Sequence, residues 1–290
     1  MDIGIIGIGL MGKAFAERFL SQGVTVRIFN RTHDNLKDLV ENDVIACSTA
    51  DELISLSSTI ILMLSDAEAI NDLLPLSKHG DKQNNLQGKT ILQMATISPR
   101  QSKEIGEAIA SCGGLYLEAP VLGSIPEVQT GSLIIMAGGS KQVFDDVLPV
   151  LQVLGTTPRY IGETGSAAAL KLAMNQLIAA LTAGFSLSLG YAIKNGVDTN
   201  LFMDTVRESA LYAKTYDKKL QKYLDRDFGT ANFSTRHLLK DIRLFIDDAK
   251  AAGLNTDALE GIERITSMAA ENGMRFMDYS SIYEMIYPDS

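Results

Sequence analysis

The segment Asp2–Phe29 reads DIGIIGIGLMGKAFAERFLSQGVTVRIF and decides the fold. Its start, Asp2–Ile6, has the length and apolar content of a short strand and leads into Gly7-Ile8-Gly9-Leu10-Met11-Gly12. Ala14–Gln22 then has the period of a helix, and Val24–Phe29 alternates as a second strand. A strand, the pattern G-x-G-x-x-G, a helix and a second strand within about 30 residues are typical of a dinucleotide-binding unit.

The glycine-rich segment also predicts how the cofactor is bound. Glycine permits a tight turn and lets the backbone approach a diphosphate, whose charge is bound by free N–H groups at the N-terminus of the following helix. We therefore expect the diphosphate of a nicotinamide dinucleotide to contact Gly7, Ile8, Gly9, Leu10, Met11 and Gly12.

The residues after the second strand, Asn30-Arg31-Thr32, bear on the choice of cofactor. An NAD-preferring site usually has an Asp or Glu here, which accepts hydrogen bonds from the ribose 2′-hydroxyl. A guanidinium group suits a 2′-phosphate instead, and Asn30 and Thr32 can add hydrogen bonds. The sequence thus favours NADP(H) over NAD(H). The alternative is that Arg31 is an ordinary solvated residue that binds no phosphate.

Strands and helices continue to alternate through the first half of the chain. Further strands are expected at Val44–Ala46, Ile60–Leu64, Thr90–Met94, Leu115–Glu118, Ser132–Ala137 and Arg159–Ile161, and helices at Ala50–Leu56, Ala67–Leu74, Pro99–Ser111 and Lys141–Leu154. This alternation predicts an α/β fold of the Rossmann type, a doubly wound and mostly parallel sheet. Ligands of such sheets bind beyond the carboxyl ends of the strands, so Leu64, Ser65 and Thr96 are expected beside the cofactor.

The segment Gly165–Gly196 is expected to form one long helix, since it lacks proline, is rich in Ala and Leu and ends in Asn-Gly. Its first turns contain Lys171, and Asn175 follows four residues later on the same face. Three interpretations of Lys171 are open: the side chain extends to solvent, the helix spans a membrane, or the amine is catalytic. The lack of a basic flank and of a second apolar run argues against the membrane span.

The second half of the chain has helical periodicity only. Helices are expected at Asn200–Ala210, Tyr212–Leu224, Thr235–Ala252, Thr256–Glu271 and Ser280–Met285. We predict two domains, an NADP-binding Rossmann domain at 1–163 and an all-helical substrate and dimerisation domain at 164–290. No Gly/Pro/Ser-rich linker separates them, so the long helix is the connection and Lys171 is expected at the cleft between the domains. This position favours the catalytic interpretation.

Composition restricts the partners. The chain has 290 residues with 46% hydrophobic and 21% charged residues, as in globular proteins, and its net charge of −9 argues against nucleic acid or an anionic membrane as a partner. Cys47 and Cys112 lie far apart in the sequence and form no C-x-x-C pattern. We therefore expect no metal site, and we expect the protein to be in a reducing compartment. The sequence begins directly with a strand, so we expect a cytoplasmic protein.

Four motifs indicate a family. They are GIIGIGLMG at Gly4–Gly12, EAPVLGSIPEVQTGSLIIMAGG at Glu118–Gly139, GSAAALKLAMNQ at Gly165–Gln176 and LLKDIRL at Leu238–Leu244. In these motifs the chain resembles the β-hydroxyacid dehydrogenase family, which includes 3-hydroxyisobutyrate dehydrogenase and the glyoxylate/succinic semialdehyde reductases. The resemblance implies hydride transfer between a nicotinamide cofactor and a small acid that carries a hydroxyl or aldehyde group, by a homodimer or homotetramer.

The resemblance also implies roles for single residues. It implies that Lys171 is the acid/base and that Asn175 helps to hold the substrate. It further implies that Thr96 contacts the cofactor and that Lys240, oriented by Asp241, closes over the nicotinamide from the helical domain.

One departure from the family pattern concerns the substrate. Leu122-Gly123-Ser124 stands where many members have Ser-Gly-Gly, so the hydroxyl that commonly helps to bind the substrate carboxylate is absent at Leu122. The N–H groups of Gly123 and Ser124 and the Ser124 hydroxyl are expected to bind the acid instead. The alternative is that Leu122 favours a larger or less polar substrate.

These features together predict a reductase. We expect NADP(H)-dependent reduction of a small aldehyde that carries a carboxylate, such as succinic semialdehyde or glyoxylate. Oxidation of 3-hydroxyisobutyrate is the first alternative, and a non-catalytic nucleotide-binding module is the second. Imine reductases of related architecture typically replace the lysine, so Lys171 favours oxygen chemistry.

Overall fold

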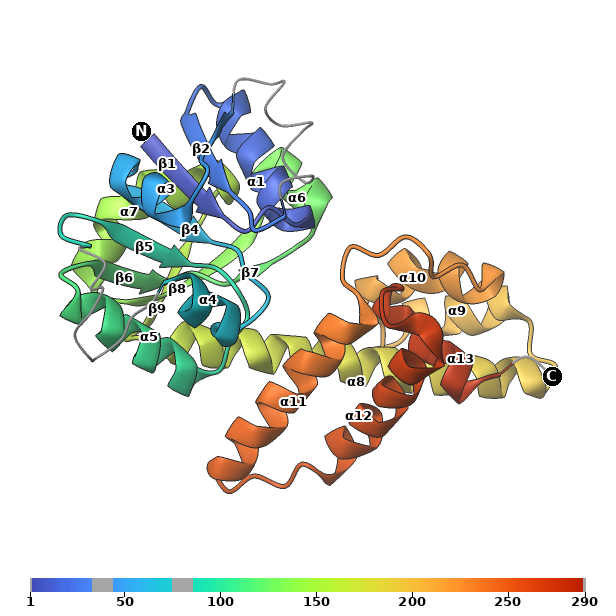
Figure 1. The fold of residues 1–290 in the computed structure, drawn as a ribbon. Coiled ribbons are helices and arrows are strands. Elements are labelled where there is room, and N and C mark those ends of the chain that lie inside the picture. The colour runs from blue at the N-terminus through green and yellow to red at the C-terminus, as the bar shows by residue number, and fades with distance from the viewer. Residues whose placement is uncertain (1, 33–43, 75–85, 289–290) are drawn as a thin grey trace. The chain divides into compact units, whose positions relative to one another are not determined.

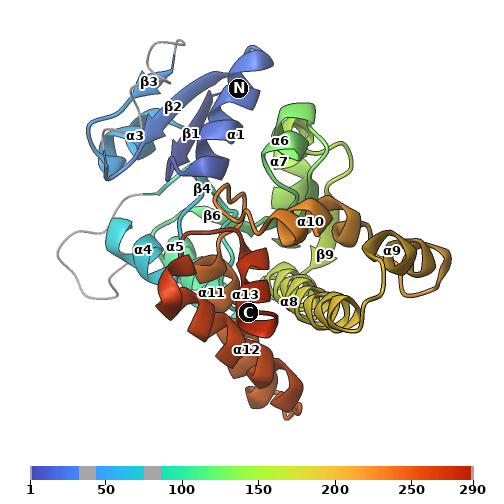
Figure 2. The same cartoon turned by 90° about the vertical axis from the view of Figure 1, so that its right-hand side faces the viewer.

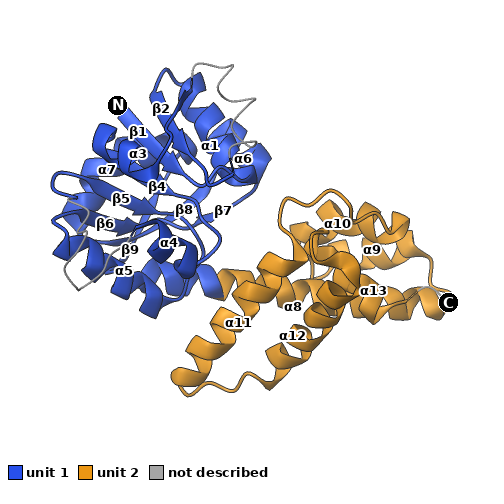
Figure 3. Ribbon diagram, viewed as in Figure 1, with its two compact units in different colours: residues 1–172 blue, residues 173–290 orange. Residues whose placement is uncertain are grey.

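The computed structural model describes residues 2–32, 44–74 and 86–288. The chain divides into two compact units, Met1–Leu172 and Ala173–Ser290 (Figure 3). The boundary lies inside the longest predicted helix, α8 (Ser166–Lys194), so the first turns of α8 belong to the unit that contains the sheet. Each unit has hydrophobic clusters of its own.

The first unit is built on a sheet in which the described residues form nine strands (Figure 1). These are β1 (Asp2–Ile6), β2 (Thr25–Phe29), β3 (Ile45–Ala46), β4 (Thr59–Leu62), β5 (Thr90–Gln93), β6 (Leu115–Glu118), β7 (Val121–Leu122), β8 (Ile134–Gly139) and β9 (Arg159–Gly162). Their order is β3-β2-β1-β4-β5-β6-β8-β7, with β9 beside β8. All pairs among β1 to β6 are parallel, whereas β8 is antiparallel to β6 and β7. The predicted mostly parallel, doubly wound sheet is confirmed.

Helices cover both faces of this sheet because its central strands are apolar on both sides. The helices are α1 (Leu10–Ser21), α3 (Ala50–Leu56), α4 (Ala67–Leu73), α5 (Pro99–Ser111), α6 (Ile125–Thr130) and α7 (Lys141–Leu154). On β1, Ile5 packs in a cluster shared by α1, α6 and α7. Its neighbour Ile6 packs in a second cluster shared by α3, α4 and α5, because successive side chains of a strand point to opposite faces.

The second unit is helical, as predicted. It contains most of α8, followed by α9 (Thr199–Glu208), α10 (Lys214–Asp225), α11 (Thr235–Ala251), α12 (Asp257–Ala269), a π-helical turn (Ala270–Met274), a 3₁₀ turn (Tyr279–Ile282) and α13 (Tyr283–Ile286). Helices α11 and α12 lie side by side (Figure 2). Ala179 of α8 packs against Leu238 and Ile242 of α11, and Phe185 of α8 packs against Tyr223 of α10.

Helix α8 also has an apolar surface that the chain leaves exposed. By length and composition α8 could cross a membrane, and 44% of its apolar 18-residue window is buried. The exposed surface, called here the α8 stripe, consists of Leu177, Leu181, Leu187 and Tyr191, which are 36% to 71% exposed. At about 3.6 residues per turn these four side chains fall on one face of the helix.

Some element boundaries differ from the sequence-based prediction. Strand β7 and helix α6 were not predicted, because each is too short to have a recognisable period. Helix α12 ends at Ala269 and is followed directly by the π-helical turn, in which Asn272 and Gly273 leave the helical region, Gly273 with a φ of +86°. The predicted helix Ser280–Met285 is a 3₁₀ turn followed by α13.

Candidate active site

The glycine-rich loop joins β1 to α1 and has a shape that requires its glycines. Gly7 has a φ of +98°, and a Cβ there would lie 2.3 Å from the Met63 carbonyl oxygen. A Cβ on Gly12 would lie 2.0 Å from the Gly7 oxygen. Gly9 is the N-cap residue of α1, and a Cβ on it would meet no described heavy atom within 4 Å. The N-terminus of α1 therefore opens onto free space, an arrangement that fits the diphosphate of a dinucleotide.

Asn30 connects this loop with the end of β2. Its Oδ1 accepts a hydrogen bond from the Ile8 N–H (2.9 Å), and its Nδ2 donates to the Thr32 carbonyl (2.8 Å). Arg31 and Thr32 are exposed at the same turn. The Asn30 side chain thus shapes the loop through backbone contacts at both ends of its amide group, while Arg31 is exposed.

Leu64 and Ser65 come after the end of β4, and Thr96 comes after the end of the neighbouring parallel strand β5. All three were predicted to lie beside the cofactor. The Leu64 side chain approaches Gly7, and the Ser65 hydroxyl donates to Asp66, the N-cap residue of α4 (2.8 Å). Thr96 follows β5, which pairs in register with β4. The structure therefore brings the glycine-rich loop, Asn30 and Leu64 together, and it places Ser65 and Thr96 at the same edge of the sheet.

The segment Leu122-Gly123-Ser124 leads from the end of β7 into α6, where Ser124 has a partner that the sequence did not predict. Both the N–H and the hydroxyl of Ser124 donate to Glu127 Oε2, each at 2.7 Å, in a capping box at the start of α6. These two donors, expected to bind the substrate acid, already have a carboxylate partner. Gly123 has a φ of +128°, and Leu122 is half-buried.

Lys171 and Asn175 lie one turn apart on α8, and both are buried. Nδ2 of Asn175 donates to Asp241 Oδ2 on α11 at 2.6 Å. The other carboxylate oxygen, Oδ1, forms an ion pair with Lys240 Nζ at 2.9 Å. In the second unit Asp241 thus joins two residues that the sequence singled out, and it contacts Lys240 as the family resemblance implied.

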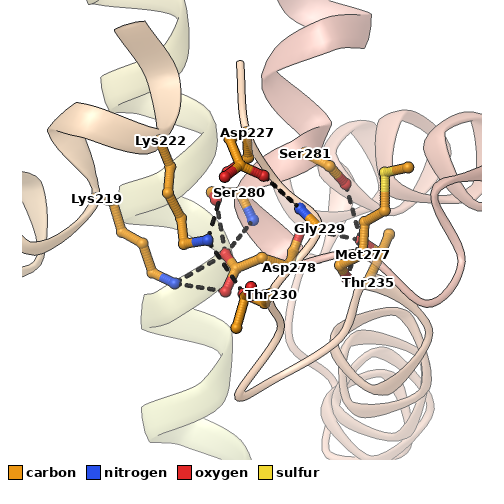
Figure 4. A network of polar contacts seen from close by, with 10 residues as sticks. All are labelled: Lys219, Lys222, Asp227, Gly229, Thr230, Thr235, Met277, Asp278, Ser280 and Ser281. Atoms are coloured by element: carbon orange, nitrogen blue, oxygen red, sulfur yellow. Dashed lines mark hydrogen bonds and ion pairs between the residues drawn. The ribbon is translucent and has the colours of Figure 1, made fainter. Parts of the chain in front are cut away.

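A second polar network fixes the start of α11, which carries Lys240 and Asp241 (Figure 4). Thr235, the first residue of α11, donates its N–H to the Met277 carbonyl (2.9 Å) and bonds through its hydroxyl to Ser281 Oγ (2.9 Å). The adjacent Asp278 is 1% exposed and pairs with Lys219 of α10 through both oxygens, at 2.8 and 2.7 Å. This network ties α10, the 3₁₀ turn and α11 together.

Sequence reasoning missed Glu118 as a site residue, although it begins one of the motifs. Its carboxylate is 1% exposed at the end of β6 and accepts hydrogen bonds from backbone N–H groups at the start of α8. Burial raises the pKa of Glu118, and the hydrogen bonds from Ser102 and the backbone oppose this shift. An acidic residue at the end of an otherwise apolar strand was the available signal.

The sequence predicted no metal site. Within residues 2–32, 44–74 and 86–288, no group of three or more His, Cys, Asp or Glu side chains could hold a metal ion. The polar residues assembled above are hydrogen-bond donors, acceptors and amines, which suit a cofactor that brings its own chemistry.

Comparisons with known proteins agree with this architecture. Residues 2–162 match the NAD binding domain of 6-phosphogluconate dehydrogenase, and residues 165–286 match the domain described as NAD-binding of NADP-dependent 3-hydroxyisobutyrate dehydrogenase. The chain is 30% identical over 290 residues to glyoxylate/succinic semialdehyde reductase 1 of Arabidopsis thaliana, with 99% of this chain and 98% of that protein covered. The chain belongs to the β-hydroxyacid dehydrogenase family.

Two further proteins similar to this chain carry different names. The crystal structure of 3-hydroxyisobutyrate dehydrogenase from Salmonella typhimurium has a TM-score of 0.85 at 22% identity, with 98% and 99% of the two chains covered. The human protein named cytokine-like nuclear factor N-PAC is 28% identical over 281 residues, which are 97% of this chain and 50% of that protein. The first likeness shows the fold, and the family assignment makes the chain an oxidoreductase of the class acting on CH–OH groups with an NAD(P)-binding domain.

Proposed function

We propose that this β-hydroxyacid dehydrogenase is an NADP(H)-dependent reductase of small aldehydes that carry a carboxylate, such as succinic semialdehyde or glyoxylate. The observation that carries the proposal is the pair of buried polar residues on α8, Lys171 and Asn175, the second bound to Asp241. A buried ammonium and a buried carboxylate are costly to retain in a purely structural helix packing. They suit a site where an oxygen gains negative charge.

The proposed preference for NADP(H) rests on the turn after β2. Arg31 is exposed there, and neither Asn30 nor Thr32 is acidic, so this turn offers a 2′-phosphate a cation and a hydroxyl. The domain matched by residues 165–286 is likewise named for an NADP-dependent enzyme.

The proposed reaction assigns one proton transfer to this chain. The reduced nicotinamide supplies hydride to the aldehyde carbon when it is bound. Lys171 as an ammonium stabilises the charge that develops on the carbonyl oxygen and donates its proton there, and in the oxidative direction the same amine accepts the proton. General acid/base catalysis of this kind contributes about 10²- to 10⁴-fold. Asn175 and Lys240 are proposed to contact substrate and cofactor, with Asp241 orienting both side chains.

The test is the loss of reduced-nicotinamide absorbance with NADPH and with NADH, each against glyoxylate, succinic semialdehyde and methylmalonate semialdehyde. Wild type is compared with Lys171→Ala and with Lys194→Ala, a control lysine at the exposed end of the same helix. Turnover with NADPH that is lost only in Lys171→Ala supports the proposal. Equal turnover by Lys171→Ala contradicts it.

Oxidation of 3-hydroxyisobutyrate is the second candidate, and the name of the domain matched at residues 165–286 favours it. The same enzyme preparation tested with 3-hydroxyisobutyrate and NADP⁺ or NAD⁺ separates the two, because the better substrate has the higher kcat/KM. A non-catalytic nucleotide-binding module would bind NADPH and turn over none of these acids.

We also propose that the chain forms a homodimer or homotetramer in the cytoplasm, without a membrane or nucleic-acid partner. The α8 stripe is apolar and exposed, and a second copy of the chain can cover it. The net charge of −9 opposes binding to nucleic acid or to anionic lipid. Light scattering of the purified protein, with Leu187→Glu as the variant expected to dissociate it, tests the assembly. Cell fractionation tests the compartment.

A further inference from the structure

The N-terminus of α8 is capped by a carboxylate from a distant part of the chain. The Gly165 carbonyl accepts the hydrogen bond of the Ala169 N–H (3.0 Å), which makes Gly165 the N-cap residue, but glycine has no side chain to bind the free N–H groups of the first turn. Glu118 supplies the acceptor. Its Oε1 receives hydrogen bonds from the N–H groups of Gly165 (2.8 Å), Ala167 (2.8 Å) and Ala168 (3.3 Å).

The second oxygen of this carboxylate is held by a chain of hydroxyl groups. Ser102 of α5 donates its hydroxyl proton to Glu118 Oε2, and the Ser102 oxygen lies 2.8 Å from the Tyr116 hydroxyl. With Glu118 ionised, Tyr116 donates to Ser102 and Ser102 donates to Glu118, so every hydroxyl proton has an acceptor. The geometry therefore suits the ionised carboxylate, which also interacts favourably with the helix dipole.

The backbone beside this carboxylate leaves no room for a side chain at position 138. Gly138 of β8 is the register partner of Glu118 on β6, and a Cβ on Gly138 would lie 2.4 Å from Glu118 Oε1. Gly165 has a φ of +101°, a conformation that favours glycine. Oε1 therefore lies against Gly138 and accepts hydrogen bonds from the three N–H groups at the start of α8.

Keeping a carboxylate 1% exposed is costly, because it is removed from water. A side-chain cap at position 165 is disfavoured, because Gly165 is buried, has a φ of +101°, and a Cβ on it would lie 2.8 Å from Lys103 Cε. What the buried carboxylate adds is a rigid connection between the end of β6 and the first turn of α8. Lys171 lies in the next turn, four residues after Ala167 and three after Ala168, so its Cα position follows from that of the first turn.

We propose that Glu118 is a positioning residue for Lys171: by binding the N–H groups of Gly165, Ala167 and Ala168 at the start of α8, it fixes the axial position and rotation of the helix that carries the amine. The proposal rests on the proposed function of Lys171 as the acid/base. All groups involved lie within the unit Met1–Leu172.

The test compares Glu118→Ala, which removes the acceptor, with Glu118→Gln, which retains one oxygen acceptor. Ser102→Ala loosens the carboxylate without removing it, and it is measured as well in case Glu118→Ala does not fold. Glu52→Ala is the matched control, since Glu52 also binds a backbone N–H, that of Ser48, near the start of α3. For wild type and each variant we measure kcat, KM, the Kd for NADPH and the hydrogen exchange of peptides that cover residues 163–172.

We expect Glu118→Ala to lower kcat by about tenfold to hundredfold, because a displacement near 1 Å can cost about 10² in rate. The Kd for NADPH is expected to change less than about twofold, and exchange at residues 163–172 to accelerate. Glu118→Gln should restore most of the rate, Ser102→Ala should lie between, and Glu52→Ala should match wild type. A kcat of Glu118→Ala equal to that of wild type, or equal losses in Glu118→Ala and Glu52→Ala, overturns the proposal.

A readout that needs no turnover separates this proposal from the proposed function. Modification of Lys171 by an amine-selective reagent is followed by mass spectrometry in wild type, Glu118→Ala and Glu118→Gln. If wild type reduces none of the acids but Glu118→Ala changes the rate of Lys171 modification, the proposed reaction fails and the positioning stands. If neither this rate nor the exchange changes, the positioning fails.

Discussion

Asn175 donates a hydrogen bond of 2.6 Å from its side-chain amide to Asp241, a residue 66 positions later in the chain. Asp241 is 2% exposed, and its other oxygen pairs with Lys240. One carboxylate therefore sets the orientation of an amide on α8 and of an ammonium on α11. Its own role is indirect, because it acts through these two side chains.

Replacing Asp241 by Ala is expected to reduce kcat/KM by an amount equivalent to about 1–3 kcal/mol, because the Asn175 amide loses its buried acceptor. Asp241→Asn should lose less, since it keeps one oxygen acceptor. Asp247→Ala, an exposed aspartate on the same helix, is the control. Steady-state kinetics with NADPH and the best acid measure the effect, and equal kinetics for Asp241→Ala and Asp247→Ala would show that the network plays no part.

Arg31→Ala is expected to raise the KM for NADPH and leave that for NADH nearly unchanged, because only NADPH carries the 2′-phosphate that the guanidinium would bind. A lost hydrogen bond to a charged group of this kind is worth about 1.5–3 kcal/mol. Arg100→Ala, which removes an exposed arginine at the start of α5, should change neither KM. A parallel rise for both cofactors in Arg31→Ala would contradict the assignment to the 2′-phosphate.

Ser124→Ala is expected to leave the KM for the acid substrate within about threefold of wild type, because the N–H and hydroxyl of Ser124 already donate to Glu127. The loss of the capping box should instead reduce the free energy of unfolding by about 0.5–2 kcal/mol. Urea denaturation and substrate titration measure the two quantities. A large rise in KM at unchanged stability would mean that Ser124 leaves Glu127 to bind substrate.

Lys219→Met is expected to lower the free energy of unfolding by about 3–5 kcal/mol, because it leaves Asp278 buried and without its ammonium partner. The double variant Lys219→Met with Asp278→Asn should recover part of this loss. Lys222→Met, which removes a half-buried lysine of the same helix that donates to the Thr230 carbonyl and pairs with no buried carboxylate among the described residues, is the control (Figure 4). A double variant no more stable than Lys219→Met would contradict the role of charge burial.

The pH dependence of stability should report on Glu118. Burial raises its pKa in the folded protein above the ordinary value of 4.5, so the folded state binds the proton more tightly than the unfolded state. The stabilising contribution is therefore complete below the ordinary pKa and is lost as the pH rises through the raised pKa. As the pH rises through this raised pKa, wild type should lose stability relative to Glu118→Gln, measured by urea denaturation. A difference that stays constant, or that changes in the opposite direction, would contradict this.

The sequence predicted the parts of the fold that depend on local pattern. The G-x-G-x-x-G loop, the alternating strands and the apolar helix α8 follow from short-range periodicity, and the family motifs identified Lys171 and Asn175. The contacts of Glu118 with the start of α8 join residues 47 to 50 positions apart, and no local pattern encodes such a pairing. The contact of Ser124 with Glu127 was not predicted either, because this acceptor becomes evident only when α6 forms.

The central claim is that Lys171 supports hydride transfer from the cofactor to a carboxylate-bearing aldehyde. Its most direct test uses NADPH carrying deuterium at the transferable position of the nicotinamide, with mass spectrometry of the hydroxyacid formed by wild type and by Lys171→Met. The account predicts one deuterium per product molecule with wild type, and almost no product with Lys171→Met despite unchanged NADPH binding. Labelled product at the wild-type rate from Lys171→Met, or no labelled product from wild type with any of the three aldehydes, would contradict it.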